Sequence, residues 1–268
     1  MERCKSLLLP QEKHLAVCVL ASGSRGNAVF ISGPDTAILV DAGLSGVEIE
    51  RRLATIGVNP RSLDAIVISH EHTDHVRGAG ILCRRHKLPL YITAPTHKAA
   101  LAQLGGIDDC RYFACGQSFS INTLTIHPFS LSHDARDPSG FTFQSGGAKA
   151  GLATDLGVAT TMVREHLKGC GALILEANHD AEMLLNGSYP WPVKQRIKSR
   201  NGHLSNDDSM RLLAELDHKD LAHVVLAHLS HENNTPERAL ATVGAALRDS
   251  RASLSVALQD QCGKMFHL

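Results

Sequence analysis

The sequence of 268 residues has no excess of charge of either sign, because 27 Lys and Arg balance 27 Asp and Glu. Its bulk charge therefore gives no indication of a nucleic-acid or membrane partner, and any such contact must come from a local patch. Long apolar runs are also missing near the start, since Leu7–Leu9 is followed at once by Pro10 and charged residues. That run is too short for a signal or membrane segment, so we expect a cytoplasmic protein with no membrane partner.

Paired cysteines are absent as well. The seven cysteines are an odd, scattered set without a Cys-x-x-Cys pair, which excludes a secreted disulfide scaffold and indicates reduced, mostly buried thiols. The chain also has no low-complexity tract, no clear internal repeat and no loop long enough to link two domains. Because 43% of the residues are hydrophobic, a substantial core can form, and we expect one domain over residues 1–268.

Short β-branched apolar runs alternate with longer helical stretches, which predicts an α/β fold. Ser205 and Thr235 stand where helix N-caps belong. The predicted loops are 22–27 and 134–147. The predicted helices are 46–56, 76–87, 95–104, 158–167, 205–216 and 235–248.

Five predicted strands each stop at a carboxylate or an imidazole. Open α/β sheets carry their sites at the carboxyl ends of strands, so we expect these side chains at one edge of the fold. The runs 36–40, 65–69, 150–154, 171–175 and 224–227 end at Asp41, His70, Asp155, Glu176 and His228, respectively.

The densest group of potential metal ligands is the segment 70–75, which reads His-Glu-His-Thr-Asp-His. Alternate side chains of an extended segment point the same way, so His70 and His72 can bind one ion. Asp74 and His75, at the following turn, can face a second ion. Imidazole and carboxylate ligands favour zinc, manganese or iron over calcium or magnesium. A solvated, His-rich loop is the alternative.

Two metals held by this segment would each need one more imidazole, and a shared carboxylate would bridge them. His133, Asp155 and His228 follow separate apolar runs and are the candidates for these positions. Taken singly, each is more typical of a capping or hydrogen-bonded residue. Together they complete a ligand set.

In order and spacing, these residues resemble the five motifs of the metallo-β-lactamase superfamily over most of the chain. The resemblance implies a four-layer αββα sandwich with a dinuclear site at one edge. It implies that Asp155 bridges the metals and that Asp41 orients a ligand imidazole or the motif loop. It also implies a site one of His70, His72 and His133 and a site two of Asp74, His75 and His228.

Four further strings resemble the YycJ/WalJ-like group of that superfamily, which is similar to ribonuclease Z and other nucleic-acid phosphodiesterases. In ribonuclease Z-like enzymes, an imidazole placed as His203 is thought to help protonate the leaving oxygen. The chain has neither the large insertion of the β-CASP nucleases nor an evident flexible arm between Asp155 and His228. The strings are ASGSRGN at 21–27, LEANHD at 175–180, GHLSN at 202–206 and HLSHENN at 228–234.

Two metals would hold a hydroxide for in-line attack on phosphorus and stabilise the entering and leaving oxygens. His203, held by Glu176, is expected to act as general acid, and Asp74 joins them as a third catalytic candidate. Each residue also has a structural alternative. His203 could simply neighbour the helix cap Ser205, and Glu176 could cap a loop.

A basic run at 194–200 shortly precedes His203 and could contact a phosphate backbone through Lys194, Arg196 and Lys198. A solvated helix face is the alternative. Ser24 and Asn27 belong to a glycine-containing loop whose N–H groups could bind phosphate, or which forms a simple turn. Trp191 could stack on a base of the substrate, or pack at the rim of the site.

The expected function is therefore that of a metal-dependent phosphodiesterase acting on nucleic acid, DNA more than RNA, as an exonuclease with two zinc or manganese ions. A small cyclic or linear phosphodiester is the second candidate substrate. Hydrolysis of a thioester or β-lactam would use the same metals. A non-catalytic binding protein that retains the fold is the alternative from outside the enzymes.

Overall fold

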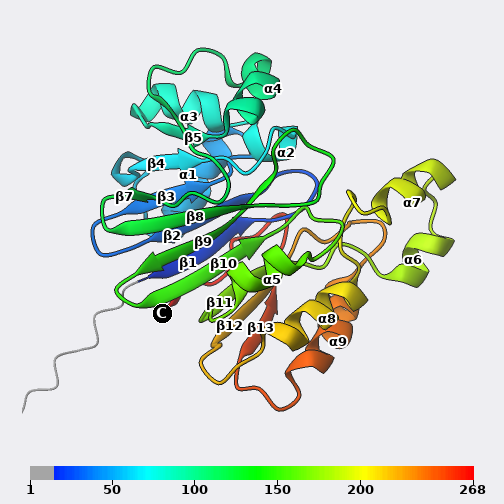
Figure 1. Ribbon diagram of the computed structural model, residues 1–268. Helices are drawn as coiled ribbons and strands as arrows, with labels where there is room; N and C mark the ends of the chain where they lie inside the picture. The colour runs from blue at the N-terminus through cyan, green and yellow to red at the C-terminus, as the bar shows by residue number, and fades with distance from the viewer. Residues whose placement is uncertain (1–14) are drawn as a thin grey trace, which may run out of the picture.

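Two seven-stranded sheets pack face to face, with helices on their outer faces, in the computed structural model, which describes residues 15–268 (Figure 1). The strand orders are β14-β1-β2-β3-β4-β5-β6 and β13-β12-β11-β10-β9-β8-β7. The four-layer αββα sandwich expected from the sequence is thus confirmed. Within the described range, no helix is long and apolar enough to cross a membrane.

Each sheet combines a parallel half with antiparallel strands. Strands β3 to β6 are parallel in the first sheet and β10 to β13 in the second, so the carboxyl ends within each parallel set share an edge. The first sheet consists of β1 (Ala16–Ala21), β2 (Ala28–Ser32), β3 (Ala37–Val40), β4 (Ala65–Val67), β5 (Leu90–Ile92), β6 (Cys110–Tyr112) and β14 (Phe266–His267). The second consists of β7 (Phe119–Ile121), β8 (Leu124–Ser130), β9 (Ser139–Ser145), β10 (Ala148–Ala153), β11 (Ala172–Glu176), β12 (His223–Ala227) and β13 (Ser253–Val256).

The helices divide between the two outer faces, and α6 and α7 project from the body of the molecule (Figure 1). Short 3-10 helices span Pro60–Ser62 and Gly244–Leu247. The helices are α1 (Gly46–Thr55), α2 (Thr73–Val76), α3 (Ala79–His86), α4 (Ala94–Leu104), α5 (Thr161–Leu167), α6 (Ala181–Asn186), α7 (Trp191–Ile197), α8 (Asn206–Leu216) and α9 (Pro236–Val243).

Three layers of buried apolar side chains hold the sandwich together. The middle layer lies between the sheets and includes Ile31, Phe141 and Phe143. A second layer joins the first sheet to α1, α3 and α4, and a third joins the other sheet to α5, α8 and α9. Strands buried on both faces read as continuous apolar runs, which is why the strand ends were visible in the sequence.

The predicted strands and helices correspond to β3, β4, β10, β11, β12 and to α1, α3, α4, α5, α8 and α9, with shifted ends. The predicted helix 76–87 is divided, because α2 ends at Val76 and α3 begins only after Gly78. The predicted N-caps are confirmed: Ser205 accepts a hydrogen bond from the Asp208 N–H, and Thr235 caps α9 in the same way. Helices α6 and α7 were not predicted.

The predicted loop 134–147 is wrong over its second half, which forms β9. Phe141 and Phe143 enter the core between the sheets, and β9 pairs with both β8 and β10. Gly140 has a packing role in this strand, since a Cβ there would lie 2.5 Å from the Phe129 ring.

The cysteines within residues 15–268 are all free thiols. Cys18, Cys83 and Cys170 are buried, and the other three are partly exposed. Burial raises the pKa of Cys18 and of Cys83 to about 12. Cys4 and the apolar run at 7–9 lie outside the described residues.

Candidate metal centre

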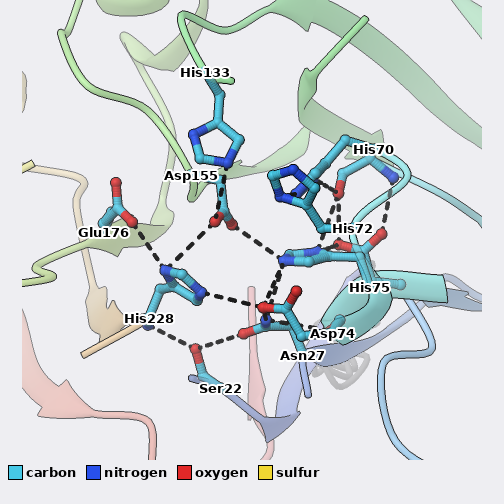
Figure 2. A network of polar contacts seen from close by, with 12 residues as sticks. Ser22, Asn27, His70, His72, Asp74, His75, His133, Asp155, Glu176 and His228 are labelled. Atoms are coloured by element: carbon cyan, nitrogen blue, oxygen red, sulfur yellow. Dashed lines mark hydrogen bonds and ion pairs between the residues drawn. The ribbon is translucent and has the colours of Figure 1, made fainter. Parts of the chain in front are cut away.

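Imidazoles and carboxylates from several separate segments converge at the edge where the parallel strands of both sheets end (Figure 2). The first sheet contributes the 70–75 segment, which follows β4 and continues into α2. The second contributes residues that follow β8, β10 and β12. The structure thereby brings together all the expected ligands, His70, His72, Asp74, His75, His133, Asp155 and His228.

One ligand group consists only of imidazoles. Ligand atoms of His70, His72 and His133 all lie within 4.8 Å of one another. His70 Nε2 is 3.1 Å from His72 Nδ1, and His133 Nδ1 lies 3.1 Å from the Gly202 carbonyl oxygen. That carbonyl fixes the orientation of the His133 ring and leaves Nε2 toward the group.

A second group combines a carboxylate with two imidazoles. Asp74 Oδ2 is 3.6 Å from Nε2 of both His75 and His228. Asp155 lies between the two groups: its Oδ2 is 3.3 Å from His75 Nε2, and its Oδ1 is 3.8 Å from His133 Nε2. Figure 2 shows Asp155 in this central position, where a bridging carboxylate was expected.

Two atoms of the centre lack the partners that buried polar atoms normally have. Asp155 Oδ2 and His228 Nε2 are buried, and neither forms a hydrogen bond within the described part of the chain. An unpaired buried polar atom is costly, and a divalent cation would use the same lone pairs. Clustered imidazole and carboxylate donors fit zinc, manganese or iron. The centre is therefore a cluster able to bind metal.

The carboxylates and imidazoles strongly perturb one another. Burial opposes a charge on His75, but Asp41 and Asp155 raise its pKa well above the ordinary value. Burial also opposes a charge on Asp155, yet His228 and His75 hold the pKa of that carboxyl well below its usual range. A negative charge buried at the centre therefore requires a positive one, which either an imidazolium or a metal ion can supply.

Three residues of the centre have a left-handed backbone. The φ angles are 59° at Asp41, 62° at Asp155 and 56° at His228, one or two residues after the ends of β3, β10 and β12. Asp and His tolerate this conformation better than most residues, although it still costs on the order of 1–3 kcal/mol at each position. The chain thus turns sharply at the strand ends that deliver these side chains.

Asp41 holds the first-sheet side of the centre. Its Oδ2 accepts a hydrogen bond of 2.8 Å from His75 Nδ1, and its Oδ1 accepts one of 2.8 Å from the Ser69 N–H. The contacts orient a ligand imidazole and also the start of the 70–75 segment, as the resemblance implied. Ser69 was not predicted as a functional residue, because in the sequence it only precedes the histidine motif.

Asn27 is placed differently from the sequence-based expectation. It is buried, and its Nδ2 lies 3.3 Å from Asp74 Oδ2 and 3.0 Å from His75 Nε2. Because the side chain faces the ligands from behind, we reassign it from substrate binding to positioning Asp74 and His75. Ser24, from the same loop, is exposed and does line the cavity above the ligands.

Glu176 connects His203 to the ligand His228. Its Oε1 lies 2.7 Å from His203 Nδ1 and 3.0 Å from His228 Nδ1, while Oε2 accepts hydrogen bonds from the N–H groups of Leu156 and Leu204. The carboxyl is fully buried, which opposes its charge, but His203 lowers its pKa to about 2. Glu176 therefore contacts both imidazole rings and restricts their orientation.

His203 borders a cavity of about 250 Å³ that lies over the ligands. Its side chain is 20% exposed, and its backbone N–H donates to the Ile197 carbonyl at the end of α7. Gly202 permits this close approach, since a Cβ there would lie 2.0 Å from the Ile197 oxygen. With Nδ1 directed at Glu176, the other ring nitrogen is left for the cavity.

The basic side chains of 194–200 separate into different roles. Lys194 Nζ donates to the carbonyls of Leu185 and Gly187, each at 2.7 Å, so it closes the end of α6 and the expectation that it binds substrate is revised. Arg196 lines the cavity and pairs with Asp134 at 2.9 Å. Lys198 is exposed at the C-cap of α7 and is not among the residues that line the cavity.

Two residues that support the centre were missed as functional residues. Ser22 Oγ accepts a 2.7 Å hydrogen bond from the His228 N–H, and Asn178 Nδ2 donates to the His228 carbonyl at 2.8 Å. Both fix the left-handed turn at His228. Sequence spacing alone does not reveal a contact between distant segments. The only signal that could have identified Ser22 and Asn178 was their position inside the strings 21–27 and 175–180, which resemble a known group.

A four-layer αββα sandwich with clustered imidazoles and carboxylates at one edge defines a hydrolase of the metallo-β-lactamase fold. Residues 36–229 match the model of the β-lactamase superfamily domain, and the chain belongs to this family.

Three known proteins illustrate this relationship. The chain is 36% identical over 233 residues to the exodeoxyribonuclease YycJ of Bacillus anthracis, covering 86% of this chain and 88% of that protein. It is 38% identical over 229 residues to the exodeoxyribonuclease WalJ of Streptococcus pneumoniae, covering 84% and 85%, respectively. The crystal structure of the metallo-β-lactamase fold protein YhfI from Bacillus subtilis superposes with a TM-score of 0.75 at 18% identity, covering 95% of this chain and 99% of that one.

Proposed function

We propose that this hydrolase is an exodeoxyribonuclease that cleaves phosphodiester bonds of DNA with two divalent metal ions, zinc or manganese. The observation that carries the proposal is the pair of ligand groups with Asp155 between them. Sites with two adjacent metals are common in enzymes that cleave phosphate esters. The names of the two relatives, both exodeoxyribonucleases, support DNA as the substrate.

The two groups of imidazoles and carboxylates support a particular assignment of the metals. His70, His72 and His133 would hold one ion, Asp74, His75 and His228 the other, and Asp155 would contact both. Bound ions would stabilise charge on the phosphoryl oxygens and lower the pKa of water. Asp41 and Asn27 orient the ligands from behind.

His203 is the candidate general acid. Glu176 holds its Nδ1, so the opposite nitrogen can donate a proton to the alkoxide that leaves the phosphorus. Asp74 acts as a ligand in this assignment and not as a proton donor.

The rim of the cavity offers contacts for the strand. Ser24 and Arg196 line the cavity, and Lys198 is exposed directly after α7. Arg196 would exchange Asp134 for a phosphate, because their ion pair is exposed and therefore weak. These groups supply local positive charge that the neutral composition does not indicate.

A substrate panel with purified, metal-loaded protein tests the proposal. End-labelled single-stranded and double-stranded DNA, matched RNA, bis-p-nitrophenyl phosphate and a thioester are each incubated with the wild type and with His72→Ala. We expect stepwise shortening of DNA from an end, less cleavage of RNA, and no cleavage by His72→Ala. Thioester turnover without phosphodiester turnover would overturn the proposal.

The small volume of the cavity favours one second candidate. About 250 Å³ also admits a small cyclic or linear phosphodiester without a longer strand. In that case bis-p-nitrophenyl phosphate and cyclic nucleotides would be hydrolysed while labelled DNA remained intact.

A further inference from the structure

A larger cavity of about 580 Å³ adjoins the metal centre, and it is called the side cavity below. Three segments surround it: the loop 22–25 after β1, the segment 229–236 after β12 and the segment 257–261 after β13, with Tyr189 contributed from between α6 and α7. Ser24 lines both cavities. The loop that contains Ser24 is therefore the wall between the side cavity and the metal centre.

The side cavity is built directly onto a metal-ligand turn. Leu229 and Ser230, which line it, follow His228 in the chain. Ser22 belongs to its lining as well and accepts the hydrogen bond from the His228 N–H. A group bound here would consequently lie beside whatever the centre holds.

The charges that line the side cavity are paired. Arg25 contacts Asp260 at 2.7 Å, and His231 contacts Glu232 at 3.2 Å. Gln259 is also engaged at both ends, since its Oε1 accepts from the Arg25 N–H and its Nε2 donates to the Gly26 carbonyl. The lining sets two carboxylates, Glu232 and Asp260, against one guanidinium, Arg25, so the side cavity is a poor place for a second phosphate.

The remaining lining suits a flat, neutral group. Leu229, Pro236 and Leu258 provide apolar surface, and Tyr189 provides an aromatic ring that is only half buried. The volume of about 580 Å³ falls within the range of pockets that enclose small organic ligands. Stacking on an aromatic ring accepts any base, as an enzyme that shortens DNA of any sequence requires.

We propose that the side cavity binds a nucleobase of the DNA strand, on the nucleotide next to the bond that is cut, and that Tyr189 stacks on this base. The inference rests on the proposed nuclease function. It adds the place where one base of the DNA binds, outside the metal centre. The loop 22–25 then separates the subsite for the base from the subsite for the phosphate.

The test removes the base instead of the whole nucleotide. Single-stranded oligonucleotides carry a tetrahydrofuran abasic residue on one side or the other of the first bond cleaved, and kcat/KM is compared with that of the intact strand. A stacked base contributes about fivefold or more to kcat/KM. The measured quantity is the ratio of kcat/KM for the intact strand to kcat/KM for the abasic strand. We expect a ratio of about five or more for the wild type at one of the two positions. For Tyr189→Ala we expect a ratio near one.

Three variants complete the design. Tyr189→Phe keeps the ring and should keep the ratio, whereas Leu258→Trp fills the side cavity and should reduce it. Tyr112→Ala removes a more exposed tyrosine ring from β6, the edge strand of the first sheet, so it should leave the ratio unchanged. Metal content and melting temperature of every variant verify that the fold and the centre are intact.

Each other outcome counts against the inference. Equal cleavage of intact and abasic strands by the wild type, or an unchanged ratio in both Tyr189→Ala and Leu258→Trp, would show that no base lies in the side cavity while leaving the nuclease function in place. If the ratio fell to one only in Trp191→Ala, the base would stack on Trp191 of α7 and not on Tyr189. Failure to cleave any DNA would overturn the nuclease function, and this inference with it.

Discussion

At the scale of single residues, the centre separates side chains that can hold metal from one that can move a proton. The ligands are oriented by buried partners such as Asp41, and Asp155 Oδ2 is left without a hydrogen bond among residues 15–268. His203 differs because it shares Glu176 with His228 yet is 20% exposed, against 4% for His228. Its contribution should therefore depend on the leaving group and not on metal binding.

Replacing His203 with Ala should slow DNA cleavage by about 10²- to 10⁴-fold, the range for loss of a general acid. Bis-p-nitrophenyl phosphate should be affected much less, because p-nitrophenolate leaves without needing a proton. Metal content, measured by elemental analysis, should equal that of the wild type. His97→Ala, which removes an imidazole paired with Tyr112 on the far side of the first sheet, is the control. Equal losses on both substrates, or a loss of metal, would show that His203 is a ligand or a structural residue.

The sequence identifies these residues but not their contacts. Acids and imidazoles at strand ends predict a common edge, because parallel strands end together. The same pattern does not reveal that Asn27 faces inward or that Lys194 closes α6, since both depend on how loops fold over the strand ends. Sequence patterns are least able to predict the contacts of side chains that have several possible partners.

At the scale of secondary-structure elements, the fold was most predictable where period and capping agree. Helix α8 has a Ser205 cap and begins where expected, whereas α6 and α7 are short and lack a clear apolar period. Strand β9 was hidden because Gly140 resembles a loop signal, although it is a packing position under Phe129. Elements defined by contacts with the rest of the fold are the ones that local patterns miss.

The end of α7 sets the position of His203, so Gly202 should be intolerant of a side chain. Gly202→Ala would place a methyl group 2.0 Å from the Ile197 carbonyl oxygen and force the loop outward. We expect a loss of about 1–3 kcal/mol in the free energy of unfolding and reduced DNA cleavage with metal still bound. Urea unfolding and nuclease assays measure the two effects. Gly106→Ala is the matched control, because a Cβ at Gly106 has no atom within 4 Å; similar results for both variants would contradict this account.

At the scale of the whole molecule, the centre joins the two sheets. The 70–75 segment belongs to the first sheet, and His133, Asp155 and His228 belong to the second. The order of the motifs and their resemblance to a known family were enough to predict this architecture and the side chains that meet at the centre. The side cavity could not be predicted, because its walls come from three segments whose only common feature is their place around the His228 turn.

Because both sheets contribute candidate ligands, metal binding should stabilise the whole fold. A ligand present at a hundred times its Kd stabilises the native state by about 2.7 kcal/mol, which corresponds to a rise in Tm on the order of 5 °C for a chain of this size. We expect such a rise when zinc or manganese is added to chelator-treated wild type, measured by differential scanning calorimetry. His72→Ala from the first sheet and His228→Ala from the second should each lose most of it, whereas the exposed His231→Ala should keep it. If His228→Ala retained the full rise, the metal would be held by the first sheet alone, and the two halves of the sandwich would not share the centre.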